Sequence, residues 1–202
     1  MDSVQEKIRQ TVLAEGEGKV YFPSDFFDYG SEKAVSKALQ RLVEEEVLMR
    51  MERGIYCSPT ESHWGMGRLP AGSDAVVEAI AKRDCIRLAP SYLEAQNMLG
   101  LSDQVVMNPV YSTDGPSRHI SYRKGLRPIV FYHVSPKVFN CKSRVVMLTI
   151  IALADIGPDR LWEFDMDALC SLYKRIPYAE IREDLKITPS WIRKIIMDFY
   201  AN

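Results

Sequence analysis

Residues 31–57 read SEKAVSKALQRLVEEEVLMRMERGIYC and decide the predicted fold of the N-terminal part of the chain. Apolar residues recur in them at i, i+3, i+4, i+7 and i+8, namely at Val35, Ala38, Leu39, Leu42 and Val43. This spacing is typical of an amphipathic helix that packs one face on a core, and it predicts a helix over residues 31–46. Apolar runs at residues 47–51 and 55–57 flank the turn Glu52-Arg53-Gly54, which predicts a β-hairpin after the helix.

Residues 1–30 predict a helix, a strand and a second, short helix. Ser3-x-x-Glu6 is a capping box, which satisfies free backbone N–H groups at a helix start, and Gly16 ends that helix. Val20-Tyr21-Phe22 suits a brief strand, and Pro23-Ser24 begins a short helix over Asp25–Tyr29. Followed by the longer helix and the hairpin, this is the element order of a winged helix. We therefore predict an α+β protein with an N-terminal winged helix-turn-helix domain over residues 1–60.

Beyond this domain the composition changes. Residues 58–72 are rich in Gly and Pro and predict a boundary between domains. We expect a mixed α/β C-terminal domain over residues 70–202, whose residues 158–202 form a helical tail. Its predicted helices lie at 74–82, between Ser91 and Gly100, at 144–154, near 167–174 and 179–185, and from Thr188 onward, and its predicted strands lie at 85–88, 105–111, 119–122 and 129–134.

The polar face of the helix at 31–46 suits contact with DNA. Lys33, Lys37 and Arg41 recur every four residues, and a helix that enters the major groove places such side chains near base edges and phosphates. Basic residues on the hairpin would meet the phosphate backbone or the minor groove. The predicted DNA-binding residues are Ser31, Lys33, Ser36, Lys37, Gln40, Arg41, Arg50 and Arg53. Since residues 1–60 carry a net charge of −3, a solvated face or a protein-binding winged helix stays an alternative.

A second basic region follows in the C-terminal part. Residues 116–154 contain seven Lys and Arg and no acid, with aromatic residues between them. Basic and aromatic residues together suit contact with nucleic acid, but they also suit an acidic protein partner or ordinary loops. The predicted patch for nucleic acid or a partner consists of Arg118, Arg123, Lys124, Arg127 and Lys137.

The sequence lacks the signatures of common enzymes. It contains no nucleophile elbow, phosphate-binding loop, dinucleotide fingerprint or zinc-protease motif. Asp165-x-Asp167 falls at a predicted helix start, where acids complement the helix dipole, so we favour that role over a metal site. The four cysteines, Cys57, Cys85, Cys141 and Cys170, never form C-x-x-C, and we interpret them as scattered buried thiols. We expect no enzymatic activity, no catalytic residues, no metal and no cofactor.

Two further features concern location and the tail. The longest apolar stretch, near 145–153, is shorter than the ~20 residues that span a bilayer, and the N-terminus lacks a signal-peptide core, so we expect a cytoplasmic protein with no membrane partner.

Residues 179–199, with a turn at 185–189, resemble a second helix-turn-helix. A packing pair of helices anchored by Trp191 is the interpretation that we prefer from sequence.

Several motifs together resemble the AbiEi-type antitoxins of bacterial type IV toxin–antitoxin and abortive-infection systems. The resemblance covers roughly residues 3–157. The motifs are Phe22-Pro23-Ser24-Asp25-Phe26, Gly30-Ser31, Ala34-Val35-x-x-Ala38-Leu39-x-Arg41-Leu42, Arg53-Gly54-Ile55-Tyr56, Ala79-Ile80-Ala81-x-Arg83-Asp84, Leu99-Gly100-Leu101-Ser102-x-Gln104-Val105 and Tyr111-x-Thr113-Asp114-Gly115-Pro116-Ser117-Arg118. The chain departs from the family at Cys85, where a glycine is often found.

This resemblance implies a transcriptional autorepressor whose winged helix binds double-stranded promoter DNA of its own operon. It also implies a partner, a nucleotidyltransferase-type toxin encoded beside it, which the antitoxin counters. The alternative is a protein-interaction module that neutralises or scaffolds a partner without binding DNA. A nucleotidyltransferase is disfavoured, because neither Gly30-Ser31 nor Gly72-Ser73 is followed by paired carboxylates.

Overall fold

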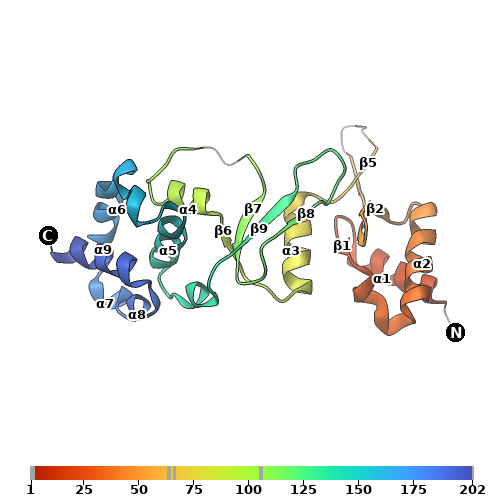
Figure 1. The fold of residues 1–202 in the computed structure, drawn as a ribbon. Coiled ribbons are helices and arrows are strands. Elements are labelled where there is room, and N and C mark those ends of the chain that lie inside the picture. Colours follow the sequence, from red (N-terminus) through yellow and green to blue (C-terminus); the bar gives the residue numbers. More distant parts are fainter. Residues whose placement is uncertain (1–2, 63–64, 66, 105–106, 202) are drawn as a thin grey trace. The chain divides into compact units, whose positions relative to one another are not determined.

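The computed structural model describes residues 3–62, 65, 67–104 and 107–201 and shows a mixed α+β protein (Figure 1). Contacts within the chain divide it into two compact units. The N-terminal unit comprises Met1–Cys85 and Ile120–Ile129, and the C-terminal unit comprises Ile86–His119 and Val130–Asn202. The segment 1–60 that the sequence marks as a domain lies inside the larger N-terminal unit.

The elements predicted for residues 1–60 are present in the predicted order. Ser3 begins the first helix as expected, since its Oγ accepts a hydrogen bond from the Glu6 N–H at 3.2 Å. The second, short helix is a 3-10 helix, η1. Up to residue 85 the elements are α1 (Val4–Glu15), β1 (Val20–Tyr21), η1 (Pro23–Tyr29), α2 (Glu32–Glu44), β2 (Met49–Glu52), β3 (Ile55–Cys57), β4 (Thr60–Glu61), β5 (Arg68–Leu69) and α3 (Ser73–Arg83).

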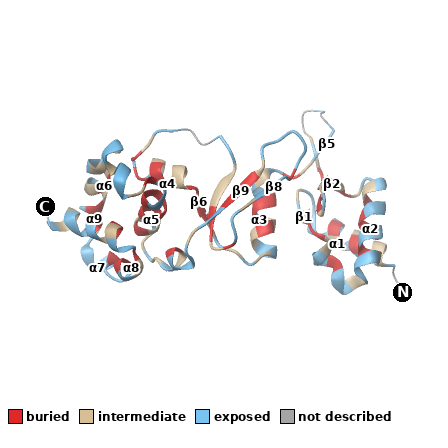
Figure 2. Ribbon diagram, viewed as in Figure 1, coloured by how far each residue is buried: buried red, intermediate tan, exposed pale blue. Residues whose placement is uncertain are grey.

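A three-stranded antiparallel sheet and two packed helices form the core of the N-terminal unit. The strand order is β1-β3-β2, so that Cys57 on the central strand pairs with Val20 on one side and Met49 on the other. Helices α1 and α2 pack on each other through residues that Figure 2 colours as buried, including Ile8 and Leu39. Helix α3 packs near β1, where the Arg83 guanidinium lies 4.1 Å from the centre of the Phe22 ring.

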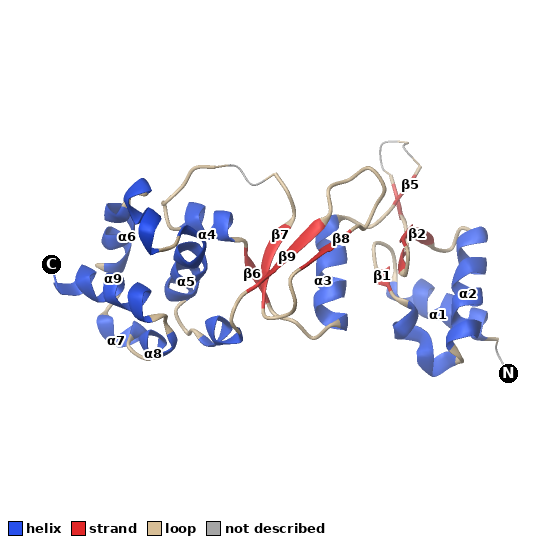
Figure 3. Ribbon diagram, viewed as in Figure 1, coloured by secondary structure: helices blue, strands red, loops and turns tan. Residues whose placement is uncertain are grey.

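The rest of the chain combines a four-stranded sheet with a helical bundle. The strand order is β6-β7-β9-β8, with β7 antiparallel to β6 and parallel to β9 (Figure 3). The elements are β6 (Leu88–Pro90), α4 (Tyr92–Met98), β7 (Val110–Thr113), β8 (Arg118–Ile120), β9 (Ile129–His133), η2 (Pro136–Asn140), α5 (Arg144–Ile156), η3 (Pro158–Glu163), α6 (Met166–Tyr173), α7 (Tyr178–Ile181), α8 (Asp184–Ile187) and α9 (Ser190–Ala201).

Three predicted elements are displaced. The strand predicted at 85–88 begins only at Leu88, because Cys85 adopts a left-handed backbone (φ 52°) that ends α3. The strand predicted at 105–111 is β7, Val110–Thr113, and residues 105–106 of that prediction lie outside the described residues. The single helix predicted at 179–185 is split into α7 and α8.

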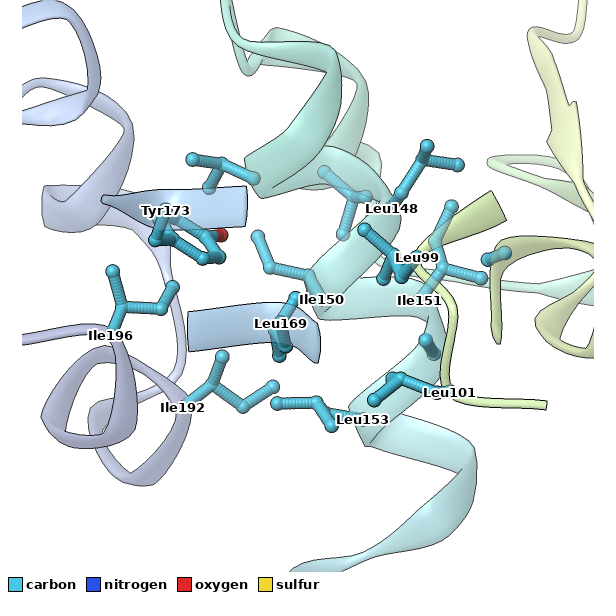
Figure 4. Close-up of a cluster of buried hydrophobic side chains, with 14 of the residues drawn as sticks. Leu99, Leu101, Leu148, Ile150, Ile151, Leu153, Leu169, Tyr173, Ile192 and Ile196 are labelled. Atoms are coloured by element: carbon cyan, nitrogen blue, oxygen red, sulfur yellow. The ribbon is translucent and has the colours of Figure 1, made fainter. Parts of the chain in front are cut away.

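The core of the bundle surrounds the apolar helix α5. Figure 4 shows Leu153 of α5, Leu169 and Tyr173 of α6, and Ile192 and Ile196 of α9 in one cluster, and all five are fully buried. The Tyr173 hydroxyl donates to Thr149 Oγ1 at 2.9 Å, so the buried phenol has a polar partner on α5. The predicted helical tail is therefore a packed part of the fold.

Candidate nucleic-acid interface

Helix α2 is positioned at its start by two local features. The Oγ of Ser31 caps the helix and accepts a hydrogen bond from the Ala34 N–H at 3.4 Å. Gly30 precedes it at a close approach, since a Cβ there would lie 2.8 Å from Val4 Cγ2 on α1. A larger residue at position 30 would require the Val4 side chain to shift, so glycine allows the chain to pass close to α1 at this corner. Ser31, predicted as a DNA contact, serves here as the helix cap.

The two faces of α2 are separated as the sequence predicts. Val35, Leu39 and Leu42 are fully buried against α1 and η1. Each of the predicted contact residues on this helix is exposed, namely Lys33, Ser36, Lys37, Gln40 and Arg41. A helix held by a buried stripe can present the opposite side chains to a partner without loss of packing.

The basic side chains of this face are available for a partner. Within the part of the chain that the structure describes, none of the side chains of Lys33, Lys37, Arg41, Arg50 and Arg53 forms a salt bridge. Gln40 is different, because its Nε2 donates to Glu44 Oε1 at 3.2 Å. A contact of Gln40 with a base would require this bond to break.

Acids at the end of α2 have cationic partners within the protein. The Glu45 carboxylate accepts hydrogen bonds from Arg9 and, at 2.8 Å, from Gln5 Nε2. Arg68 donates to the Glu46 carbonyl, and its Nη1 lies 3.9 Å from Glu46 Oε2. These pairs partly offset the negative charge beside the basic face. These pairs were not predicted from the sequence, because no local pattern links two residues that lie 36 or 22 positions apart in the chain.

The hairpin after α2 places two predicted contacts in solvent. Strands β2 and β3 are joined by a tight turn at Arg53-Gly54, and Gly54 adopts a left-handed backbone (φ 76°) that suits glycine. Arg53 at this turn is exposed. Arg50 is also exposed and pairs with Tyr56 on the central strand, so the sheet fixes its position.

The predicted second basic patch is divided between the two units. Arg123, Lys124 and Arg127 belong to the N-terminal unit and are exposed on the β8–β9 loop. That loop contains a turn closed by the Leu126 N–H and the Arg123 carbonyl at 3.3 Å. Arg118 and Lys137 belong to the C-terminal unit. There the Arg118 guanidinium lies 5.5 Å from the centre of the Phe131 ring, and Lys137 is exposed on η2.

An arginine that the sequence analysis did not single out organises the C-terminal unit. The Arg87 guanidinium donates to Asp114 Oδ2 at 2.7 Å, to Asn140 Oδ1 at 3.0 Å and to the Pro136 carbonyl at 3.1 Å. Hydrogen bonding to Arg87 holds the pKa of the Asp114 carboxyl below its usual range. Asp114-Gly115 was predicted only as a turn, and no local signal pointed to an arginine 27 positions away.

His133 also contacts the turn at Asp114-Gly115. Its Nδ1 lies 2.9 Å from the Gly115 carbonyl, and its backbone N–H donates to Ser117 Oγ at 2.8 Å. Gly115 has little room, since a Cβ would lie 2.6 Å from Ile86 Cγ2. The motif that begins at Thr113 thus forms a structural junction between β7 and β8.

The aspartates and cysteines that the sequence offers as possible metal-binding or reactive groups lie at ordinary structural positions. Asp165 caps α6, as predicted for a helix start, with its Oδ1 accepting from the Asp167 N–H at 3.0 Å. Among the described residues, no group of three or more His, Cys, Asp and Glu could hold a metal ion. Cys57 is buried as predicted, Cys141 and Cys170 are partly buried, and Cys85 is exposed, so the prediction of a buried thiol is wrong at Cys85. Burial raises the pKa of Cys141 to about 11. The left-handed backbone at Cys85 turns the chain at the surface.

Comparison with known proteins identifies a family. The chain matches a family of unknown function, DUF6088, over residues 6–181. The chain belongs to this family. The match includes α2, the hairpin and the β8–β9 loop, and it ends before α8 and α9. No curated protein matches the chain. Among the described helices, none is long and apolar enough to cross a membrane.

Proposed function

We propose that this member of DUF6088 is a sequence-specific DNA-binding transcriptional autorepressor, and that residues 1–60 form a winged helix. The observation that carries the proposal is the exposed face of α2, where Lys33, Lys37 and Arg41 follow one another at successive turns and form no salt bridge within the described chain. Such a face suits phosphate oxygens and base edges in the major groove.

The order and pairing of the elements support this assignment. Helix α2 follows the short helix η1 and precedes the β2–β3 hairpin, and β1 completes an antiparallel sheet in the order β1-β3-β2. In this arrangement α2 would lie in the major groove. The turn at Arg53 would lie beside the phosphate backbone or the minor groove.

The proposal extends to the biological role through the resemblance to AbiEi-type antitoxins. The DNA would be the promoter of the protein's own operon, in the cytoplasm of a bacterium. The toxin of the nucleotidyltransferase type would be a second partner, and the protein would not itself be an enzyme. An adjacent nucleotidyltransferase gene would support this role directly.

The test compares two double variants with equal loss of charge. Lys37→Ala with Arg41→Ala removes two side chains from the α2 face, whereas Lys7→Ala with Lys19→Ala removes two exposed lysines elsewhere in the N-terminal unit. The probe is a labelled duplex from the region upstream of the gene, titrated at several salt concentrations. We expect the α2 variant to bind more weakly and to lower the log–log salt slope by about one unit for each lost phosphate contact.

The control variant should bind like the wild type, and neither variant should change the melting temperature, because all four side chains are exposed. Unchanged affinity of the α2 variant would contradict the assignment of α2. That result would favour the alternative, a module that neutralises or scaffolds a protein partner without binding DNA.

A further inference from the structure

Helices α6 to α9 form a compact bundle at the C-terminal end of the chain. Helix α6 packs against α9, and α7 with α8 leads into α9 through the two residues Thr188 and Pro189. Two helices joined by a short turn, with a third helix packed against the second of them, make up a helix-turn-helix. The shared core of the bundle is at most 4% exposed and consists of Leu169, Tyr173, Ile181, Leu185, Ile192 and Ile196. Figure 4 shows four of them, Leu169, Tyr173, Ile192 and Ile196, in one cluster.

The turn before α9 is fixed by hydrogen bonds. The buried Thr188 hydroxyl donates to the Asp184 carbonyl at 2.9 Å. The Asp184 carboxylate, also buried, accepts the backbone N–H groups of Lys142 at 3.0 Å and Ser143 at 2.7 Å. This contact attaches α8 to the start of α5. Helix α9 is therefore held in a defined orientation on a rigid support.

Helix α9 presents a polar face away from this core. Ser190, Lys194 and Met197 lie at i, i+4 and i+7 and are all exposed, whereas Ile192 and Ile196 are fully buried. Arg193 lies beside this stripe and is half-exposed. Lys194 is the basic residue of this stripe, and the exposed acid Asp198 follows Met197. In helix-turn-helix proteins, residues from the N-terminal part of the second helix contact base edges.

The charge around α9 is complementary to DNA. Residues 174–201 contain six basic residues and four acids, and one of the acids, the exposed Asp198, lies on α9 itself. One of the acids, Asp184, is buried with both carboxylate oxygens hydrogen-bonded, and a second, Glu183, pairs with Lys186 at 2.7 Å. The basic residues are exposed apart from the half-exposed Arg193, and they are Lys174, Arg175, Arg182, Lys186, Arg193 and Lys194. The outer surface thus carries an excess of positive charge, which attracts phosphate.

A pair of helices that only packs does not account for this surface. Trp191 is half-buried against the core, as expected for a packing anchor, but packing requires only the inner side of α9. We propose that α6–α9 form a second DNA-binding element, in which α9 enters the major groove of a duplex and Ser190, Arg193 and Lys194 contact it. This element is independent of the α2 face, and most of it lies beyond the family match, which ends at residue 181.

The experiment uses the full chain and a labelled DNA duplex of mixed sequence. Arg193→Glu with Lys194→Glu reverses two charges on α9, and Lys7→Glu with Lys19→Glu makes the same change at two exposed lysines of the N-terminal unit as the control. Both pairs are measured in the wild type and in the background of Lys37→Ala with Arg41→Ala. In that background we expect the α9 variant to bind about tenfold more weakly, as for the loss of one good groove contact, and the control to lose clearly less.

A bridging assay tests whether the α9 element and the α2 face can hold two different duplexes at the same time. The wild type should carry a labelled duplex onto an immobilised duplex, and the α9 variant should lose this activity while it still binds a single duplex. Lys194→Gln, a milder change at an exposed position, should give a smaller loss in the same direction. Bridging retained by the α9 variant, unchanged affinity in both backgrounds, or an equal loss in the control variant would each overturn the proposal. Since the α9 pair is also measured with α2 intact, failure of the α2 assignment would not obscure the result.

Discussion

Arg87 and Asp114 are joined twice: the Arg87 backbone N–H donates to Asp114 Oδ1 at 2.7 Å, and the guanidinium Nε donates to Oδ2, also at 2.7 Å. The same guanidinium bonds to Asn140 and lies 5.0 Å from the centre of the Phe139 ring. One side chain therefore links the segment before β6, the end of β7 and the helix η2. This junction gives a stability prediction whose size depends on pH.

Asp114→Asn should destabilise the protein by about 1 kcal/mol at neutral pH, because it removes a charged acceptor from a partly exposed pair. The pKa of Asp114 is lowered in the folded protein, mainly by the hydrogen bond from Arg87. A lowered pKa stabilises the fold above the unfolded value of about 3.9, and this contribution is lost as the pH falls through the folded value. Urea unfolding at neutral pH and near pH 3 measures the effect. A difference between the two proteins that persists undiminished at low pH would contradict it.

Local sequence patterns predicted much of this fold. The features that they did not predict depend on contacts between residues far apart in the chain. The stripe of α2 and the Ser3 cap of α1 depend on residues three or four positions apart, and the structure has both. The pairing of Arg9 with Glu45 and the parallel neighbours β7 and β9 join distant parts of the chain, and no periodicity encodes them. The candidate site follows the same division. Its exposed face was predictable, whereas the partners of the acids beside it were not.

Cys85→Gly should stabilise the protein relative to Cys85→Ala by about 1 kcal/mol, since a left-handed backbone is strained for any residue with a Cβ. Cys85 has φ 52° and an exposed side chain, so both variants lose the thiol with little loss of packing. Thermal unfolding of the two variants gives the comparison, and equal melting temperatures would show that the backbone at this position carries no strain.

Glu46 offers a matched pair of changes near the candidate DNA face. It follows α2 with φ 60°, and its side chain is 83% exposed. Glu46→Gln and Glu46→Gly remove the same charge, but only the glycine relieves the left-handed backbone. Both should strengthen promoter binding, because a negative charge near the phosphates is lost, and the glycine variant should also be more stable by about 1 kcal/mol. Weaker binding in both variants would argue against DNA beside this end of α2.

The β8–β9 loop yields the last prediction. Residues 1–60 carry a net charge of −3, and the structure groups the exposed Arg123, Lys124 and Arg127 with the N-terminal unit. Reversal of these three residues to glutamate should therefore weaken promoter binding and flatten its salt dependence by up to about three units of log–log slope. The preferred sequence should not change, since phosphate contacts position a protein without specifying bases. The full chain is the appropriate background, because a fragment of residues 1–60 would lack α3, which packs near β1.

Two assays on this triple variant separate the interpretations of the loop. In the first, promoter affinity and salt slope are measured beside those of Lys137→Glu, a single reversal at an exposed lysine of the C-terminal unit. In the second, cells that express the proposed nucleotidyltransferase-type toxin are tested for rescue. If the loop contacts phosphate, the triple variant loses affinity far more than the single reversal does, even after allowance for its larger charge change. If the loop binds the toxin, affinity is kept and rescue fails, and the role in DNA binding is excluded. An effect in neither assay would mean that the three charges are solvated surface, so that the α2 face and the hairpin alone must supply the attraction to DNA.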